Sequence, residues 1–62
     1  MRVKILAIDQ GTGHESEARV ADTHEVFGDD DDQRRYAEEE LNTTGRYYAG
    51  GGAAPLFLLT RA

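Results

Sequence analysis

The chain has 62 residues, 39% of them hydrophobic, and its 12 acidic and seven basic residues give a net charge of −5. A chain of this length forms at most one domain and buries only about 60% of the surface that it exposes when unfolded, so an enzyme with a deep pocket is not expected. It contains no cysteine, which excludes both a disulfide framework and a thiolate zinc site. We expect one soluble, cytoplasmic domain over 1–62, because the charged start is too short for a signal peptide and no apolar run is long enough to span a bilayer.

The first predicted element is a strand over 3–8, which is rich in apolar and β-branched residues. Together with the loop that follows, residues 5–13 resemble the opening strand and phosphate loop of the glycerol-kinase-like sugar kinases, in which an apolar strand ends in Asp-Gln-Gly-Thr. Residues 13–15 depart from the pattern of that family, and 62 residues cannot form two domains that close on ATP. We therefore interpret 9–13 as a hairpin loop whose glycines allow positive φ, and we expect no cofactor.

A second strand is predicted over 18–26, where apolar and polar residues alternate incompletely, as is typical of an edge strand. His24 in this strand could approach His14 across the hairpin and hold a metal weakly with Glu15 or Asp22. Exposed histidines without a metal are the commoner arrangement on a loop and a strand, so we predict no metal site.

A helix is predicted from about Asp30 to Asn42, after a break at Gly28. Asp29 or Asp30 provides its N-cap, and the acidic first turn suits the positive end of the helix dipole. Gly45 predicts the C-terminal stop. The apolar stripe is narrow, and its inward candidates are Tyr36, Ala37 and Leu41.

The last third of the chain predicts a short strand over 46–49, a flexible loop at 50–52 and a strand over 55–61. The final strand is the most apolar run in the chain, so we predict that it is buried on both faces. The expected fold class is α+β: a small β-β-α-β(β) domain whose three- or four-stranded, mainly antiparallel sheet carries one helix packed on one face. The other face would remain open to water, and sharing it or an edge with a second copy would produce a homodimer.

Acidic residues are concentrated in the middle of the chain, where 22–40 holds nine acids and two arginines, a local charge of −7 against +2 elsewhere. The four aspartates at 29–32 begin with the spacing of an EF-hand, but Arg34 stands where the calcium loop needs glycine, so no calcium site is predicted. A concentrated negative field repels phosphate and attracts basic surfaces. This pattern disfavours direct binding to nucleic acid and favours a protein partner with a basic, nucleic-acid-binding surface.

We therefore predict a non-enzymatic, small acidic binding protein that inhibits or modulates a nucleic-acid-binding partner by presenting an anionic, phosphate-mimicking surface. In size and charge it resembles phage-encoded inhibitors of host defence, such as anti-CRISPR and anti-restriction proteins. Adjacent strand tyrosines point to opposite faces, so one of the pair at 47–48 would be an exposed interface anchor. The predicted partner-binding residues are Asp29, Asp30, Asp31, Asp32, Glu38, Glu39, Tyr47 and Tyr48.

The alternative function is that of a small house-keeping or structural homodimer. Its acidity would then reflect solubility or adaptation to a salty cytoplasm, and the helix would be a solvated face. Self-association would use the two tyrosines and the apolar strand at 56–59.

Overall fold

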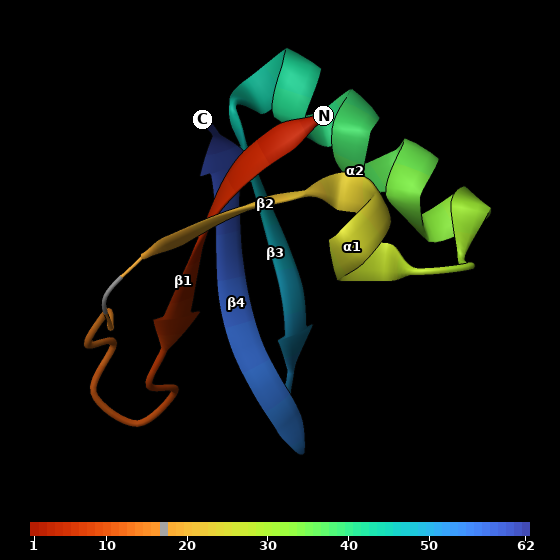
Figure 1. Cartoon of the computed structure of the whole chain (residues 1–62). Coiled ribbons are helices and arrows are strands. Elements are labelled where there is room, and N and C mark those ends of the chain that lie inside the picture. Colours follow the sequence, from red (N-terminus) through yellow and green to blue (C-terminus); the bar gives the residue numbers. More distant parts are fainter. Residues whose placement is uncertain (17) are drawn as a thin grey trace.

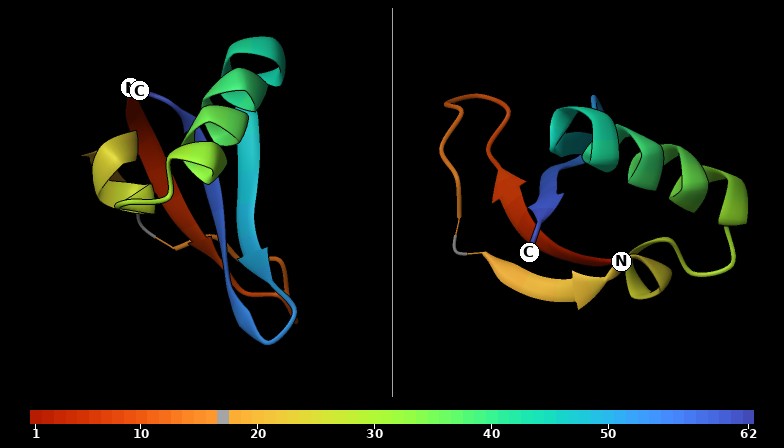
Figure 2. Two further views of the ribbon diagram at one scale, coloured as in Figure 1. Left: turned by 90° about the vertical axis from the view of Figure 1, so that its right-hand side faces the viewer. Right: turned by 90° about the horizontal axis from the view of Figure 1, so that it is seen from above.

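The computed structural model describes residues 1–16 and 18–62 and contains one antiparallel sheet with two helices on one of its faces (Figure 1). In chain order the elements are β1 (Arg2–Ile8), β2 (Arg19–Asp22), α1 (Thr23–Phe27), α2 (Asp31–Thr44), β3 (Arg46–Gly51) and β4 (Ala54–Arg61). The strand order is β2-β1-β4-β3, so the first and last strands of the chain are neighbours at the centre of the sheet (Figure 2). The predicted α+β class and antiparallel sheet are confirmed, with α1 as an additional short helix.

The core lies between the sheet and the helices. Alternation along β1 turns Val3 and Ile5 toward the helices, where both are buried. The register pairs Val3 with Ala21 on one side and Ile5 with Leu59 on the other, so apolar side chains meet across the strands. Leu41 of α2 covers this cluster and is fully buried. Only six hydrophobic residues are buried in the described part of the chain, which is the small core that its length predicts.

The prediction of a second strand is wrong beyond Asp22, where the chain turns into α1. The Asp22 carboxylate accepts a hydrogen bond from the His24 N–H at 2.9 Å and caps this helix, and Gly28, at φ 57°, ends it. Asp22 is paired with Arg2, the first residue of β1, so a longer β2 would run past the strand with which it pairs. One helical turn instead packs Val26 against the core.

The caps of α2 confirm the predicted helix signals. The Asp30 carboxylate accepts a hydrogen bond from the Gln33 N–H at 3.1 Å, and Gly45, at φ 84°, donates from its N–H to the carbonyl of Leu41 at 3.0 Å. The helix continues two residues beyond the predicted end because only Gly45 adopts the left-handed conformation that stops it.

The inward face of α2 differs from the prediction. Ala37 and Leu41 are buried as expected, but Tyr36 is 58% exposed. Arg34 and Glu38 are half-buried in its place and pair with each other at 3.2 Å. A charged pair four residues apart can lie on a partly covered helix face because each charge neutralises the other.

The prediction that the last strand is buried on both faces is wrong. β4 lies between β1 and β3, but the helices cover only one face of the sheet. Leu59 on the helix side is fully buried, but Phe57 is 36% exposed. Leu56 and Leu58 on the opposite side are only half-buried. A continuous apolar run was therefore not a sign of burial on both faces.

Candidate functional site

The four consecutive aspartates have different roles in the structure. Asp30 is the N-cap of α2, and the Asp31 carboxylate lies 3.5 Å from the Arg34 guanidinium. Asp29 and Asp32 are exposed, and within the described residues their side chains make no hydrogen bond or ion pair. Two of the four aspartates are therefore available for a partner, and two support the helix.

Glu38 is half-buried, whereas we predicted it on the exposed acidic surface. Its carboxylate accepts hydrogen bonds from the Thr23 hydroxyl and, at 3.2 Å, from the Arg34 guanidinium, and the amino terminus of Met1 lies 3.8 Å away. The hydrogen bond from Thr23 lowers the pKa of Glu38, and the charges of Arg34 and the amino terminus act in the same direction, against the effect of burial. Glu38 thus joins α1 to α2.

The exposed acids of α2 and its preceding loop that make no side-chain contact in the described structure define what we call the acidic surface: Asp29, Asp32 and Glu39. Asp32 and Glu39 are seven residues apart on one side of α2, which separates them by two turns, or about 10 Å. Arg35 lies between them and is exposed. Within the acidic surface, one cation therefore stands between the two helical carboxylates, and Asp29 precedes the helix.

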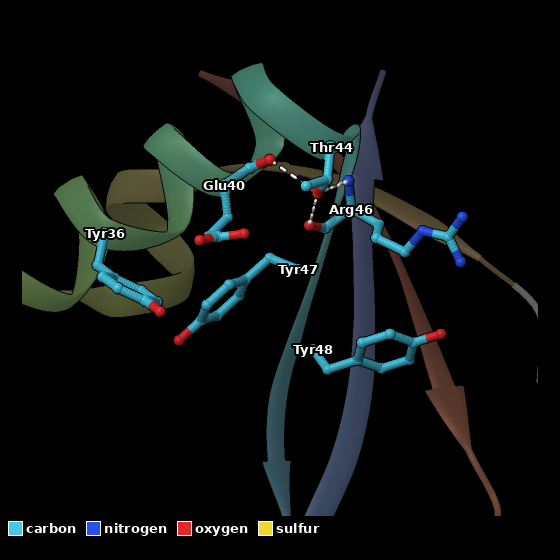
Figure 3. Close-up of a pocket in the computed structure, with 6 residues that line it drawn as sticks. All are labelled: Tyr36, Glu40, Thr44, Arg46, Tyr47 and Tyr48. Carbon is cyan, nitrogen blue, oxygen red and sulfur yellow. Dashed lines mark hydrogen bonds between the residues drawn. The ribbon is translucent and has the colours of Figure 1, made fainter.

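The two adjacent tyrosines point to opposite faces of the sheet (Figure 3). Tyr47 is half-buried on the helix side, where its ring meets Phe27 and Tyr36 edge to face, with ring centroids 6.2 Å and 6.0 Å apart. The Gln33 side-chain amide donates a hydrogen bond to the Tyr47 hydroxyl. Burial raises the pKa of Tyr47, and Tyr36 and nearby carboxylates add to this effect. Tyr48 is 50% exposed on the other face.

A shallow groove of about 390 Å³ lies between α2 and β3, and we call it the tyrosine groove. Its walls are Tyr36, Glu40, Thr44, Arg46, Tyr47 and Tyr48. The Glu40 carboxylate lies beside the rings of Tyr36 and Tyr47, whereas the Arg46 guanidinium points away from them (Figure 3). The inner part of this groove is therefore aromatic and negatively charged.

The backbone of β3 forms an outer edge of the sheet beside the tyrosine groove. The Thr44 hydroxyl accepts from the Arg46 N–H at 3.3 Å, and its single hydrogen is shared between the carbonyls of Arg46 and Glu40, each 2.9 Å away. Both backbone groups of Arg46 therefore face away from β4. Outward-facing backbone alternates along an antiparallel strand, which places the backbone groups of Tyr48 and Gly50 at the same edge. Thr44 thus occupies the backbone groups of Arg46, and the outward-facing backbone groups of Tyr48 and Gly50 remain for pairing with another strand.

The face of the sheet without helices, here called the open sheet face, is apolar at its centre. The register places Leu6, Leu58 and Tyr48 in one row across three strands, and Ile8 and Leu56 in the next. Cations lie toward one end, where Lys4, Thr60 and Arg46 form a row. At the other end, Glu15 is bridged to Ile8 and shares its face. The open sheet face therefore has an apolar centre between a cationic and an acidic end.

A second groove, of about 380 Å³, lies on the helix side beyond the end of α1. Apolar side chains dominate its walls, among them Phe27, Pro55 and Phe57, and Arg19 and Glu25 also contribute. We assign it no ligand, because opposite charges at the walls favour neither a cationic nor an anionic group.

One of the two histidines, His24, contacts the residue that caps α1. The His24 imidazole lies 2.7 Å from the carboxylate of Asp22, whose pKa is far below its usual range because it accepts hydrogen bonds from the backbone N–H and the ring of His24. The described residues contain no group of three or more side chains placed to hold a metal ion. None of the described helices combines the length and apolar character needed to cross a membrane.

Sequence reasoning missed four of the six residues that line the tyrosine groove, among them Tyr36 and Glu40. Their spacing of four residues on a helix indicates one common face, and this signal was present in the sequence. Their position beside Tyr47 depends on how α2 crosses β3, which the spacing does not contain.

The chain matches no protein-family model, no curated protein and no solved structure with which it was compared.

Proposed function

We propose that this chain is a small, non-enzymatic binding protein that covers the cationic, nucleic-acid-binding surface of a larger protein and thereby inhibits or modulates it. The observation that carries this proposal is the acidic surface, whose three exposed carboxylates, on α2 and just before it, make no hydrogen bond or ion pair in the described structure. Such carboxylates can occupy arginine and lysine sites that otherwise hold phosphate.

The distribution of charge supports this assignment. The cations of β1 and β3, such as Lys4 and Arg46, belong to the open sheet face, on the other side of the sheet from the helices. Arg35 is exposed beside the acidic surface, whereas the charge of Arg34 is paired with Asp31 and Glu38. Arg19 and Arg61 also lie on the helix side of the sheet, because they pair with Ile5 and Val3. An uneven field of this kind accelerates association with an oppositely charged partner and fixes its orientation.

The test is capture of the partner from a lysate of the native host on the tagged protein, followed by release with duplex DNA. Neutralising the acidic surface with Asp29→Asn and Asp32→Asn leaves the N-cap and the Asp31 ion pair intact. We expect this variant to lose the captured nucleic-acid-binding protein, and we expect DNA to displace that protein from the unmodified chain.

The matched control carries Glu15→Gln and Glu25→Gln, which remove the same number of charges from exposed positions elsewhere. Loss of capture in both variants would show that only net charge matters. Retention of the partner by the Asp29 and Asp32 variant would contradict the proposed function.

A structural homodimer is the second candidate, and the open sheet face favours it. Four strands about 4.8 Å apart and about seven residues long give a face of roughly 400 Å² in outline. Two such faces bury about 800 to 1,000 Å², which is below the roughly 1,200 Å² of stable specific interfaces and in the range of weak, transient ones. In an antiparallel arrangement, the cationic end of each copy meets the acidic end of the other.

A further inference from the structure

The strongest further feature is the position of a free strand edge directly beside the tyrosine groove. Both belong to β3: Tyr48 and Gly50 provide the edge, and Tyr47 provides one wall of the groove. A ligand that paired with the edge would therefore extend into the groove.

The inner groove has the chemistry of a site for a cationic side chain. The rings of Tyr36 and Tyr47 stand at 72° to each other, so an entering side chain contacts one ring face while the other ring closes the side. Cations are attracted to aromatic faces, and a guanidinium also forms two hydrogen bonds with a carboxylate. Glu40 supplies that carboxylate, and within the described residues it has no ion-pair partner.

The edge determines how such a side chain would arrive. An extended segment that adds to β3 forms backbone hydrogen bonds with Tyr48 and Gly50, as in other cases of strand addition. Its residue opposite Tyr47 then points to the same face as Tyr47, because directly paired residues share a face. That residue enters the space between Tyr36, Tyr47 and Glu40.

We propose that β3 accepts an extended peptide segment as a fifth strand, and that an arginine side chain of this segment binds between Tyr36, Tyr47 and Glu40. The proposal rests on the proposed function, since it identifies which element of a basic partner is recognised. The acidic surface attracts a partner by its negative charge, and the tyrosine groove would add a specific pocket for one side chain of that partner.

The test uses two blocked seven-residue peptides of alternating threonine and valine, with a central arginine in one and citrulline, its neutral isostere, in the other. Isotope-labelled protein is titrated with each peptide and followed by NMR. We expect the amide signals of Tyr48 and Gly50 to shift with the arginine peptide, and we expect citrulline to weaken binding about fivefold or more.

The matched variants are Glu40→Gln and Glu39→Gln, which remove one charge from adjacent positions of α2. Glu40→Gln should abolish the preference for arginine over citrulline, whereas Glu39→Gln should retain it. A third variant, Tyr36→Ala, removes an exposed ring and should weaken binding of the arginine peptide without unfolding the chain.

Several results would overturn the inference: no binding of either peptide, equal binding of both, equal effects of the two glutamine variants, or shifts that spare Tyr48 and Gly50. The capture experiment with the Asp29 and Asp32 variant is independent of these results. If only that experiment succeeds, the proposed function holds without strand addition. If only the peptide experiment succeeds, the groove binds arginine and the acidic surface is not the recognition element.

Discussion

At the scale of single residues, Glu38 shows that a carboxylate in an acidic run can be a structural group. It is joined to Thr23 and Arg34, and these contacts keep it ionised to a lower pH than in the unfolded chain. As the pH falls, the unfolded chain therefore binds protons first, and the free energy of unfolding decreases. The pKa of Asp22 is also lowered, so protonation of Asp22 likewise decreases the free energy of unfolding, but at lower pH.

We predict that Glu38→Gln lowers the free energy of unfolding at pH 7 by about 1 to 2 kcal/mol, because a charged hydrogen-bond acceptor is lost. The variant should also lose less stability than the unmodified chain between about pH 5 and pH 3. Urea titrations at several pH values measure both effects. Glu39→Gln is the control, since Glu39 is exposed, and a similar response from it would argue against a specific role of Glu38.

At the scale of elements, the hairpin between β3 and β4 depends on Gly50. This residue has φ of 83°, and a Cβ added there would collide with the carbonyl oxygen of Pro55. The register shifts between Gly50 and Gly51, so the chain bends where the edge available to a partner ends. Gly52 also has positive φ, but a Cβ there would meet open space.

The two glycines provide a matched pair for a stability measurement. Gly52→Ala introduces only the strain of positive φ, about 1 kcal/mol, whereas Gly50→Ala adds a backbone collision and should cost more than about 2 kcal/mol. Denaturant unfolding of both variants tests the difference. Equal losses would mean that the hairpin can shift to accept the new side chain at position 50.

At the scale of the whole molecule, the sheet separates two surfaces of different character. The helical layer carries the acidic surface, and the open sheet face has an apolar centre with Leu6, Leu58 and Tyr48 in one row. A sheet covered on one side only leaves such a row in contact with water. A partner bound to one surface would therefore leave the other accessible.

If the open sheet face joins two copies, Tyr48→Ser should weaken self-association at least fivefold, because an aromatic anchor at the centre of the interface is lost. Sedimentation equilibrium over a range of concentrations measures the constant, which we expect to be on the order of micromolar. Tyr36→Ser is the matched control on the other surface. If Tyr36→Ser weakened self-association instead, the contact between the copies would lie at the tyrosine groove. A chain that stays monomeric at all concentrations would exclude the homodimer.

Local signals predicted the elements well where the relevant contacts are local. The N-cap at Asp30 and the stop at Gly45 are short-range hydrogen bonds between residues a few positions apart, so the sequence contains them. The helix at 23–27 was missed because its cap, Asp22, lies within a stretch that also alternates like a strand. The point at which β2 ends depends on the pairing of Asp22 with Arg2, which is a long-range contact.

The candidate site could be predicted only in part. Composition alone indicated the acidic field, and adjacency alone indicated that one tyrosine of the pair points outward. The assignment of Asp30, Asp31 and Glu38 to structural contacts required the packing of the helices, because a count of charges does not show which of them are neutralised.

The sequence by itself determined the fold class, the helix with its caps, and the excess of acid in the middle of the chain. These follow from the order of residues along the backbone, since propensity, capping and net charge are local or additive. Only the tertiary structure decided that β4 lies beside β1, that Tyr47 meets Tyr36 and Glu40, and which acids remain free. These features depend on strand order and on how α2 crosses the sheet, and many distant contacts in a small core jointly select them.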